Sequence, residues 1–191
     1  MEAGEAWRAG KNAVAVAELT FALILALDRR VVDNTTDLRA GKWNKKEYSV
    51  ARGLKGRTLG VVGLGQIGLA VVARALAFEM EVVAWSRSLT DETAVELGIT
   101  RLNSAAEVAG ACDILSIHIA AAADTKGLIG ASVLDRLKPG SYVVNTARAD
   151  VLDYAALAKA IEKNQIRVGL DVFPGEPETA TADYHAEILK A

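Results

Sequence analysis

The sequence has little cysteine, almost no net charge and no long apolar run. Its one cysteine, Cys112, excludes an internal disulfide framework and fits a reducing compartment, so we expect a cytoplasmic protein. The 22 Lys and Arg residues nearly balance the 24 Asp and Glu residues, and no basic cluster stands out. A nucleic-acid partner is therefore not expected.

The longest apolar stretch, residues 13–27, is too short to cross a membrane. It holds about 15 residues where a bilayer needs ~20, and it contains Glu18 and Thr20. No net-positive segment precedes it and no cleavage pattern follows, so neither a membrane partner nor an export signal is expected. We expect a buried helix capped by Asn12, covered either by its own chain's core or by a second copy.

The composition and the pattern of elements indicate one α/β domain. Hydrophobic residues make up 51% of the 191 residues, which is ample for a core. Short β-branched runs predict strands at 58–62, 82–85, 100–102, 114–118, 142–145 and 168–171. Helices are expected between them, at 66–78, 91–97, 104–110, 131–137 and 154–163. This alternation predicts a doubly wound parallel sheet of Rossmann type in a three-layer αβα arrangement, and the polar segment 31–54 should wrap irregularly over a surface.

A glycine-rich turn joins the first expected strand to the first expected helix. Gly63, Gly65 and Gly68 form the pattern G-x-G-x-x-G. The first glycine permits a tight turn, the second lets the backbone approach a pyrophosphate, and the third allows close helix–strand packing. The following helix offers unpaired N–H groups and a positive dipole end to phosphates. The sequence therefore predicts a dinucleotide site.

The end of the second expected strand bears on which dinucleotide is bound. An acidic residue there would hydrogen-bond the adenosine ribose, but Ser86 stands in its place. Arg87 could pair with a 2′-phosphate, with Ser86 and Ser88 as donors. Alternatively, Arg87 lies on the adenine face or in solvent while NAD(H) binds. On balance these residues favour NADP(H) slightly.

Two more segments carry polar residues suited to chemistry: 143–150 at the end of the fifth expected strand, and 169–177 at the end of the sixth. Open α/β sheets bind ligands at such carboxyl ends. Arg148 could hold a substrate carboxylate in a bidentate fork, and Glu176 could orient a histidine and raise its pKa. From the residues alone, a structural role for either side chain stays open.

With these residues the sequence resembles the D-isomer-specific 2-hydroxyacid dehydrogenases, most closely the phosphoglycerate-dehydrogenase-like branch. The resemblance covers nearly the whole chain in order, with matching stretches at 12–27, 53–60, 63–68, 111–118, 145–148 and 171–177. It implies an NAD(P)-binding domain at 11–175, a tail or hinge at 1–10, and at 176–191 a hinge and the start of a substrate domain. It also implies a homodimer that buries residues 13–27 and 31–54.

The resemblance implies a cofactor site made of Gly63, Gly65, Gln66, Ile67, Gly68, Ser86, Arg87, Ile119, Thr146, Ala147, Arg148 and Asp171. Gln66 and Ile67 would offer backbone N–H groups to the pyrophosphate, and Ile119 would lie against the cofactor. Residues 146–148 would line the nicotinamide pocket, and Asp171 would meet its side.

The implied reaction is hydride transfer between NAD(P) and a small 2-hydroxy or 2-keto acid, such as phosphoglycerate, glyoxylate or hydroxypyruvate. Arg148 would bind the substrate's carboxylate and carbonyl, and Glu176 would partner the catalytic histidine. No metal is expected. A non-catalytic NAD(H)-sensing or corepressor-like module stays an alternative, although it would need neither Arg148 nor Glu176. An adenosylhomocysteinase-like domain is disfavoured by residues 171–177.

Three departures from the family pattern bear on activity. Ala120 replaces a usual proline, and Ala149 replaces a usual glycine. The acid–base histidine, which the family carries in a Pro-His-x-Gly-like context, is not found before Ala191. His118 should be structural or contact the cofactor, and His185 should be solvated. We expect a chain that binds dinucleotide but turns over poorly by itself.

Overall fold

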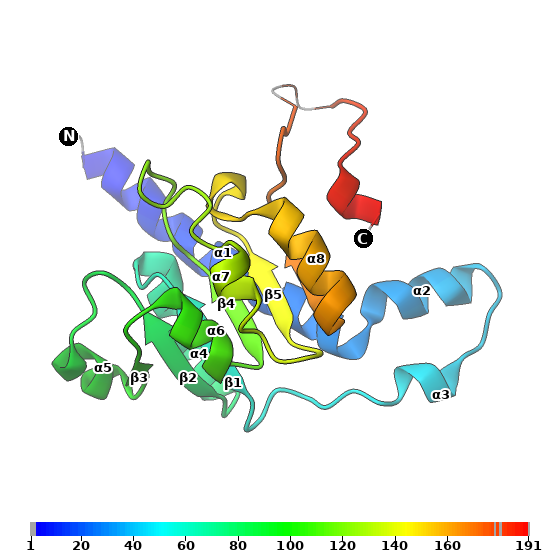
Figure 1. The fold of residues 1–191 in the computed structure, drawn as a ribbon, viewed down its shortest axis with the longest axis horizontal. Coiled ribbons are helices and arrows are strands. Elements are labelled where there is room, and N and C mark those ends of the chain that lie inside the picture. Colours follow the sequence, from blue (N-terminus) through cyan, green and yellow to red (C-terminus); the bar gives the residue numbers. More distant parts are fainter. Residues whose placement is uncertain (1–2, 178, 180, 191) are drawn as a thin grey trace.

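The computed structural model describes residues 3–177, 179 and 181–190, and a six-stranded parallel sheet lies at its centre (Figure 1). The strands are β1 (Thr58–Val62), β2 (Glu81–Trp85), β3 (Thr100–Arg101), β4 (Ile114–Ile117), β5 (Tyr142–Asn145) and β6 (Arg167–Leu170). Their order is β3-β2-β1-β4-β5-β6, and every pair is parallel. This confirms the predicted doubly wound sheet, whose strand order reverses between β1 and β4.

Helices cover both faces of the sheet, so the three-layer prediction is confirmed. The helices around the sheet are α1 (Ala3–Arg29), α4 (Gln66–Ala77), α5 (Asp91–Leu97), α6 (Ala105–Ala111), α7 (Ala131–Leu134) and α8 (Tyr154–Asn164). One apolar cluster joins α1 and α4 to one face, and a second joins α6, α7 and α8 to the other. Figure 1 shows α6, α7 and α8 in front of the sheet and α1 behind it. Because both faces are covered, β4 and β5 are buried along their whole length.

Helix α1 begins earlier than the sequence pattern predicts. It runs from Ala3 through Asn12, so Asn12 lies inside the helix and the predicted cap is wrong. One face of α1 packs in the core through Phe21, whose ring stacks on Phe78 at 5.1 Å between centroids. Val14, Leu19 and Leu25 remain 37–48% exposed. The core of the chain therefore covers only part of this apolar helix.

Residues 31–54 are more regular than expected. They contain α2 (Val31–Arg39) and α3 (Lys45–Tyr48), which project from the rest of the molecule (Figure 1). Neither helix, each described in full, contains a buried residue. We call residues 31–54 the arm; most of its side chains are exposed in the single chain, whereas Leu54 at its end is buried in the core. Nowhere in the described segments is a helix both long enough and apolar enough to cross a bilayer.

Candidate functional site

The glycine loop at the carboxyl end of β1 has the geometry that its first and third glycines predict. Gly63 adopts a φ of 98°, and its N–H donates to the Trp85 carbonyl oxygen at 2.8 Å. A Cβ on Gly68 would lie 2.1 Å from the Gly63 oxygen. Neither position tolerates a side chain, because the first needs a left-handed backbone and the second a close approach of helix to turn.

Gly65 differs from its neighbours because it faces open space. A Cβ at this position would meet no described atom within 4 Å. Gly65 is also the N-cap of α4, and no side chain caps that helix. The first N–H groups of α4 at Gln66 and Ile67 therefore lack intrahelical partners and can bind an anion. These features fit a pyrophosphate above Gly65.

Arg87 follows the end of β2 and forms part of an ion pair near the glycine loop. Arg87 is exposed and forms an ion pair with Asp124, which lies in the segment after β4. Because β1 lies between β2 and β4, this pair spans the carboxyl end of β1. Ser86 is half-buried, and its hydroxyl lies 3.5 Å from the hydroxyl of Ser88. Sequence reasoning did not include Asp124.

The end of β4 supplies a half-buried histidine and an apolar side chain. The Nε2 atom of His118 lies 2.7 Å from the Ser116 hydroxyl, while its buried Nδ1 has no partner in the described chain. Burial lowers the pKa of His118 to about 4, so the ring is neutral at pH 7. Ile119 lies against the glycine loop, with its Cγ2 2.9 Å from where a Gly63 Cβ would be. A neutral, enclosed His118 fits the structural role expected of it.

The end of β5 holds Arg148 through the side chain of Asn145. The Asn145 Oδ1 accepts from the Ala147 N–H at 3.0 Å, and its Nδ2 donates to the Arg148 oxygen at 3.0 Å. The Arg148 guanidinium is exposed and donates to the Ala147 oxygen at 2.7 Å. Thr146 points elsewhere: it is buried, with its hydroxyl 3.0 Å from that of Thr20 on α1. Of residues 146–148, Arg148 is thus the one with its side chain free for a ligand.

The end of β6 carries the two acidic residues. The Asp171 N–H donates to the Asn145 oxygen at 3.0 Å, which brings this exposed residue beside the β5 end. Glu176 is exposed, and its Oε1 accepts from the Phe173 N–H at 2.5 Å. No hydrogen bond or ion pair joins Arg148 to Glu176 in the part of the chain described.

Tyr154 on α8 fixes the segment after β6 and was not found from the sequence. Its hydroxyl donates to the Val172 oxygen at 2.9 Å. Burial, with smaller contributions from nearby Tyr184 and Glu176, raises the pKa of Tyr154 to about 12. The hydroxyl therefore stays protonated and able to donate at neutral pH. Its only sequence signal was a position just after the α8 cap, Asp153.

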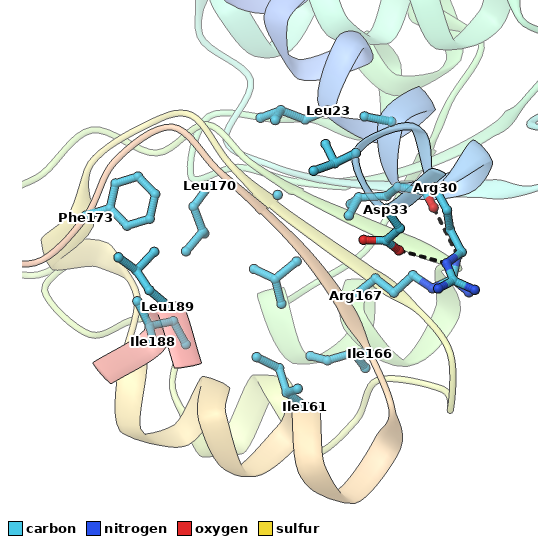
Figure 2. Close-up of a pocket in the computed structure, with 15 residues that line it drawn as sticks. Leu23, Arg30, Asp33, Ile161, Ile166, Arg167, Leu170, Phe173, Ile188 and Leu189 are labelled. Carbon is cyan, nitrogen blue, oxygen red and sulfur yellow. Dashed lines mark hydrogen bonds and ion pairs between the residues drawn. The ribbon is translucent and has the colours of Figure 1, made fainter. Parts of the chain in front are cut away.

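An apolar groove lies away from these residues. Its volume is about 690 Å³, and α1, β6, α8 and residues 188–189 line it. Figure 2 shows apolar side chains such as Leu23 and Ile161 along it, with Arg30 and Arg167 at its polar end. None of the predicted site residues lines this groove. The predicted residues gather instead at the carboxyl edge of the sheet.

Comparison with known proteins agrees with this arrangement. The family model described as "D-isomer specific 2-hydroxyacid dehydrogenase, NAD binding domain" matches residues 21–187. A glyoxylate reductase from Thermococcus litoralis is 37% identical over 183 residues, which cover 92% of this chain and 54% of the relative. This chain thus spans about half the length of that enzyme.

Two solved structures share the fold at comparable identity. A phosphoglycerate oxidoreductase from Vibrio cholerae matches with a TM-score of 0.81 and 32% identity, covering 94% of this chain and 56% of that one. A D-lactate dehydrogenase from Aquifex aeolicus, complexed with NAD and lactic acid, matches with a TM-score of 0.77 and 34% identity. That match covers 84% of this chain and 48% of the other. The three relatives all bear enzyme names, and none points to a non-catalytic module.

Proposed function

This chain belongs to the D-isomer specific 2-hydroxyacid dehydrogenase family, and from that premise we propose that it is the cofactor-binding half of a dehydrogenase. The enzyme would move a hydride between a nicotinamide dinucleotide and a small 2-hydroxy or 2-keto acid. The observation that carries this proposal is the open space above Gly65 at the start of α4, at the same carboxyl edge of the sheet as the exposed Arg148. Glyoxylate, hydroxypyruvate and phosphoglycerate are the proposed substrate range.

The cofactor would be held by backbone groups and one apolar contact. The N–H groups of Gln66 and Ile67 would bind the pyrophosphate, and Gly65 leaves room for it. Ile119 would cover the cofactor where it passes the end of β4. Asp171 would meet the nicotinamide. When bound, the nicotinamide ring supplies the hydride or accepts it.

Arg148 would bind and polarise the substrate. A guanidinium fork matches a carboxylate in two parallel hydrogen bonds, and its charge favours negative charge that develops on a neighbouring carbonyl oxygen. The Asn145 side chain fixes the backbone on both sides of Ala147 and so positions Arg148. Glu176 would orient a histidine and hold it protonated.

The part of the site that would bind the adenosine ribose of the cofactor should prefer NADP(H) slightly over NAD(H). Ser86 carries no charge that would repel a 2′-phosphate, and Arg87 stands next to it. In the free chain Arg87 pairs with Asp124, so a phosphate would have to compete with that carboxylate. Because of this competition, we propose a small preference for NADP(H) rather than a strict one.

We further propose the boundaries and assembly of the protein. Residues 11–175 form the cofactor domain, residues 1–10 a tail or hinge, and residues 176–191 a hinge leading to a substrate domain. A homodimer would bury the exposed apolar face of α1 and the arm at 31–54. Cytoplasmic location is proposed from the single, buried Cys112.

A steady-state assay tests the catalytic part of this proposal. We expect the chain to oxidise NADH or NADPH very slowly in the presence of glyoxylate or hydroxypyruvate, because no residue matches the family's acid–base histidine. Arg148→Lys should lower any activity further, since Lys cannot form the fork. Turnover by this chain at an ordinary dehydrogenase rate, above roughly 10 s⁻¹, would contradict the proposal.

A further inference from the structure

A second cavity, of about 470 Å³, lies at the amino-terminal edge of the sheet. It is lined by the first residues of β5 and β6, Tyr142 and Arg167, and by the end of α1, the end of the arm and the turn at Pro139 and Gly140. Parallel strands all begin at this edge, so the cavity lies at the opposite end of the strands from the glycine loop. We call it the arginine cavity.

Four arginines line the arginine cavity but only two carboxylates do, Asp28 and Glu47. Glu47 pairs with one of the four, Arg30. The other three, Arg29, Arg52 and Arg167, have no ion-pair partner among the side chains that the structure describes. They come from three separate segments: the end of α1, the segment before β1, and β6.

Asp28 cannot neutralise these arginines because its oxygens are already used. It accepts hydrogen bonds from the Arg57 guanidinium at 3.1 Å, the Gly53 N–H at 3.1 Å and the Tyr142 hydroxyl at 3.3 Å. Arg57 and Asp28 are both buried, so this pair is an internal one. The cavity therefore keeps a surplus of positive charge from Arg29, Arg52 and Arg167.

The ring of Tyr142 forms part of the cavity wall. The ring of Tyr142 lies under two guanidinium groups, at 4.4 Å from that of Arg57 and 5.8 Å from that of Arg167. Two buried polar atoms, Arg57 Nε and Ser141 Oγ, have no hydrogen-bond partner in the described chain; their residues lie next to Tyr142 but do not line the cavity. Buried donors without partners are uncommon and often mark a missing ion or water.

We infer that the arginine cavity binds a small, doubly charged phosphate, either inorganic phosphate or a phosphate monoester. Guanidinium groups match phosphate oxygens in bidentate pairs, and three unpaired arginines favour an anion that carries more than one charge. The site is distinct from the cofactor site because the strands separate the two edges. A bound phosphate would tie Arg52, near the end of the arm, to Arg167 on β6 and so hold the arm against the sheet.

Calorimetric titration with inorganic phosphate, at constant ionic strength set with chloride, tests the inference. The titration is done on Gly65→Val, in which the glycine loop is blocked, so that only the arginine cavity can respond. Saturable binding is expected there, and Arg52→Gln or Arg167→Gln added to it should weaken binding by about tenfold or more. Arg136→Gln, an exposed arginine outside the cavity, is the matched control and should change nothing.

Three results would overturn the inference. The first is no saturable binding, and the second is equal binding by the Gln variants and the control. The third is saturable binding to the wild type that is absent from Gly65→Val, which would place the phosphate at the glycine loop instead. Circular dichroism of each variant establishes that it is folded. Failure here leaves the proposed cofactor function untouched, because NADH binding is measured separately on chains with an intact loop.

Discussion

At the scale of single residues, the ion pair of Arg87 and Asp124 lies where the proposed site would meet the adenosine end of the cofactor. Both side chains are exposed, so the pair by itself contributes little to stability. The pair lies across the carboxyl end of β1, where it would affect the affinity for NADPH. A bound 2′-phosphate and the Asp124 carboxylate would compete for the guanidinium of Arg87.

Asp124→Asn should therefore raise the affinity for NADPH about twofold to fivefold and change the affinity for NADH less. Arg87→Ala should lower the affinity for NADPH by about tenfold, because a charged hydrogen bond to phosphate is lost. Fluorescence titration of the wild type and both variants with NADH and with NADPH gives the dissociation constants to compare. Equal effects of Arg87→Ala on NADH and NADPH would remove Arg87 as the phosphate reader.

His118 makes the stability of the fold depend on pH. Its pKa is about 4 in the folded chain and about 6.5 when unfolded, so the unfolded state binds the extra proton between these values. The free energy of unfolding should fall as the pH drops from 6.5 to 4, by about 3 kcal/mol from this residue alone. Urea unfolding of wild type and His118→Gln at pH 5 and 7 measures it, and an identical pH dependence in both would refute the assignment.

Residues of the site could be predicted where their signal is local. The glycine spacing and the polar residues after apolar runs predicted that Gly65 and Arg148 lie at the carboxyl edge of the sheet, and the structure has both there. Asp124 was missed because its importance comes from strand order, which brings its loop opposite Arg87. Thr146 lies two residues before Arg148 in the sequence, but it is buried against Thr20 of α1. No local sequence pattern reveals that contact.

At the scale of elements, the close packing of α6 on β1 depends on Gly60, because a side chain at this position would collide with the helix. A Cβ on Gly60 would lie 2.7 Å from Val108 Cγ1 and 2.8 Å from Cys112 Sγ. Burial of the same sulfur raises the pKa of Cys112 to about 12, as expected of an inert core thiol.

Gly60→Ala should lower the free energy of unfolding by about 1–3 kcal/mol, because the added methyl forces α6 away from the sheet. Gly110→Ala, on the exposed side of α6, is the control, since its new Cβ would meet atoms only at 3.9 Å or beyond. Denaturant unfolding of the two variants compares them. An unchanged stability of Gly60→Ala would show that α6 can move at little cost.

Strand bounds followed from the sequence to within a residue or so, because buried parallel strands read as apolar runs. Helix ends were harder. The start of α1 was set by the start of the apolar stretch at Ala13, yet the preceding polar residues continue the helix to Ala3. Helix α7 ends at Leu134 rather than Leu137, ahead of the turn at Pro139 and Gly140.

At the scale of the whole molecule, the exposed face of α1 and the projecting arm predict a dimer. Leu25→Glu combined with Val14→Glu should shift the protein to monomer at micromolar concentration, because charges would then replace the apolar face. Val95→Glu on α5, at a residue 80% exposed, is the control and should leave the dimer intact. Sedimentation velocity measures all three, and a monomeric wild type would contradict the prediction.

The central claim is that the open space above Gly65 holds a dinucleotide, and NADH titration followed by fluorescence tests it most directly. Gly65 has a backbone that any residue can adopt, with φ −77° and ψ −167°, so Gly65→Val should fold normally. The account predicts saturable binding to wild type and to Gly110→Ala, and at least about tenfold weaker binding to Gly65→Val. Wild-type affinity in Gly65→Val, or no binding to the wild type, would contradict it.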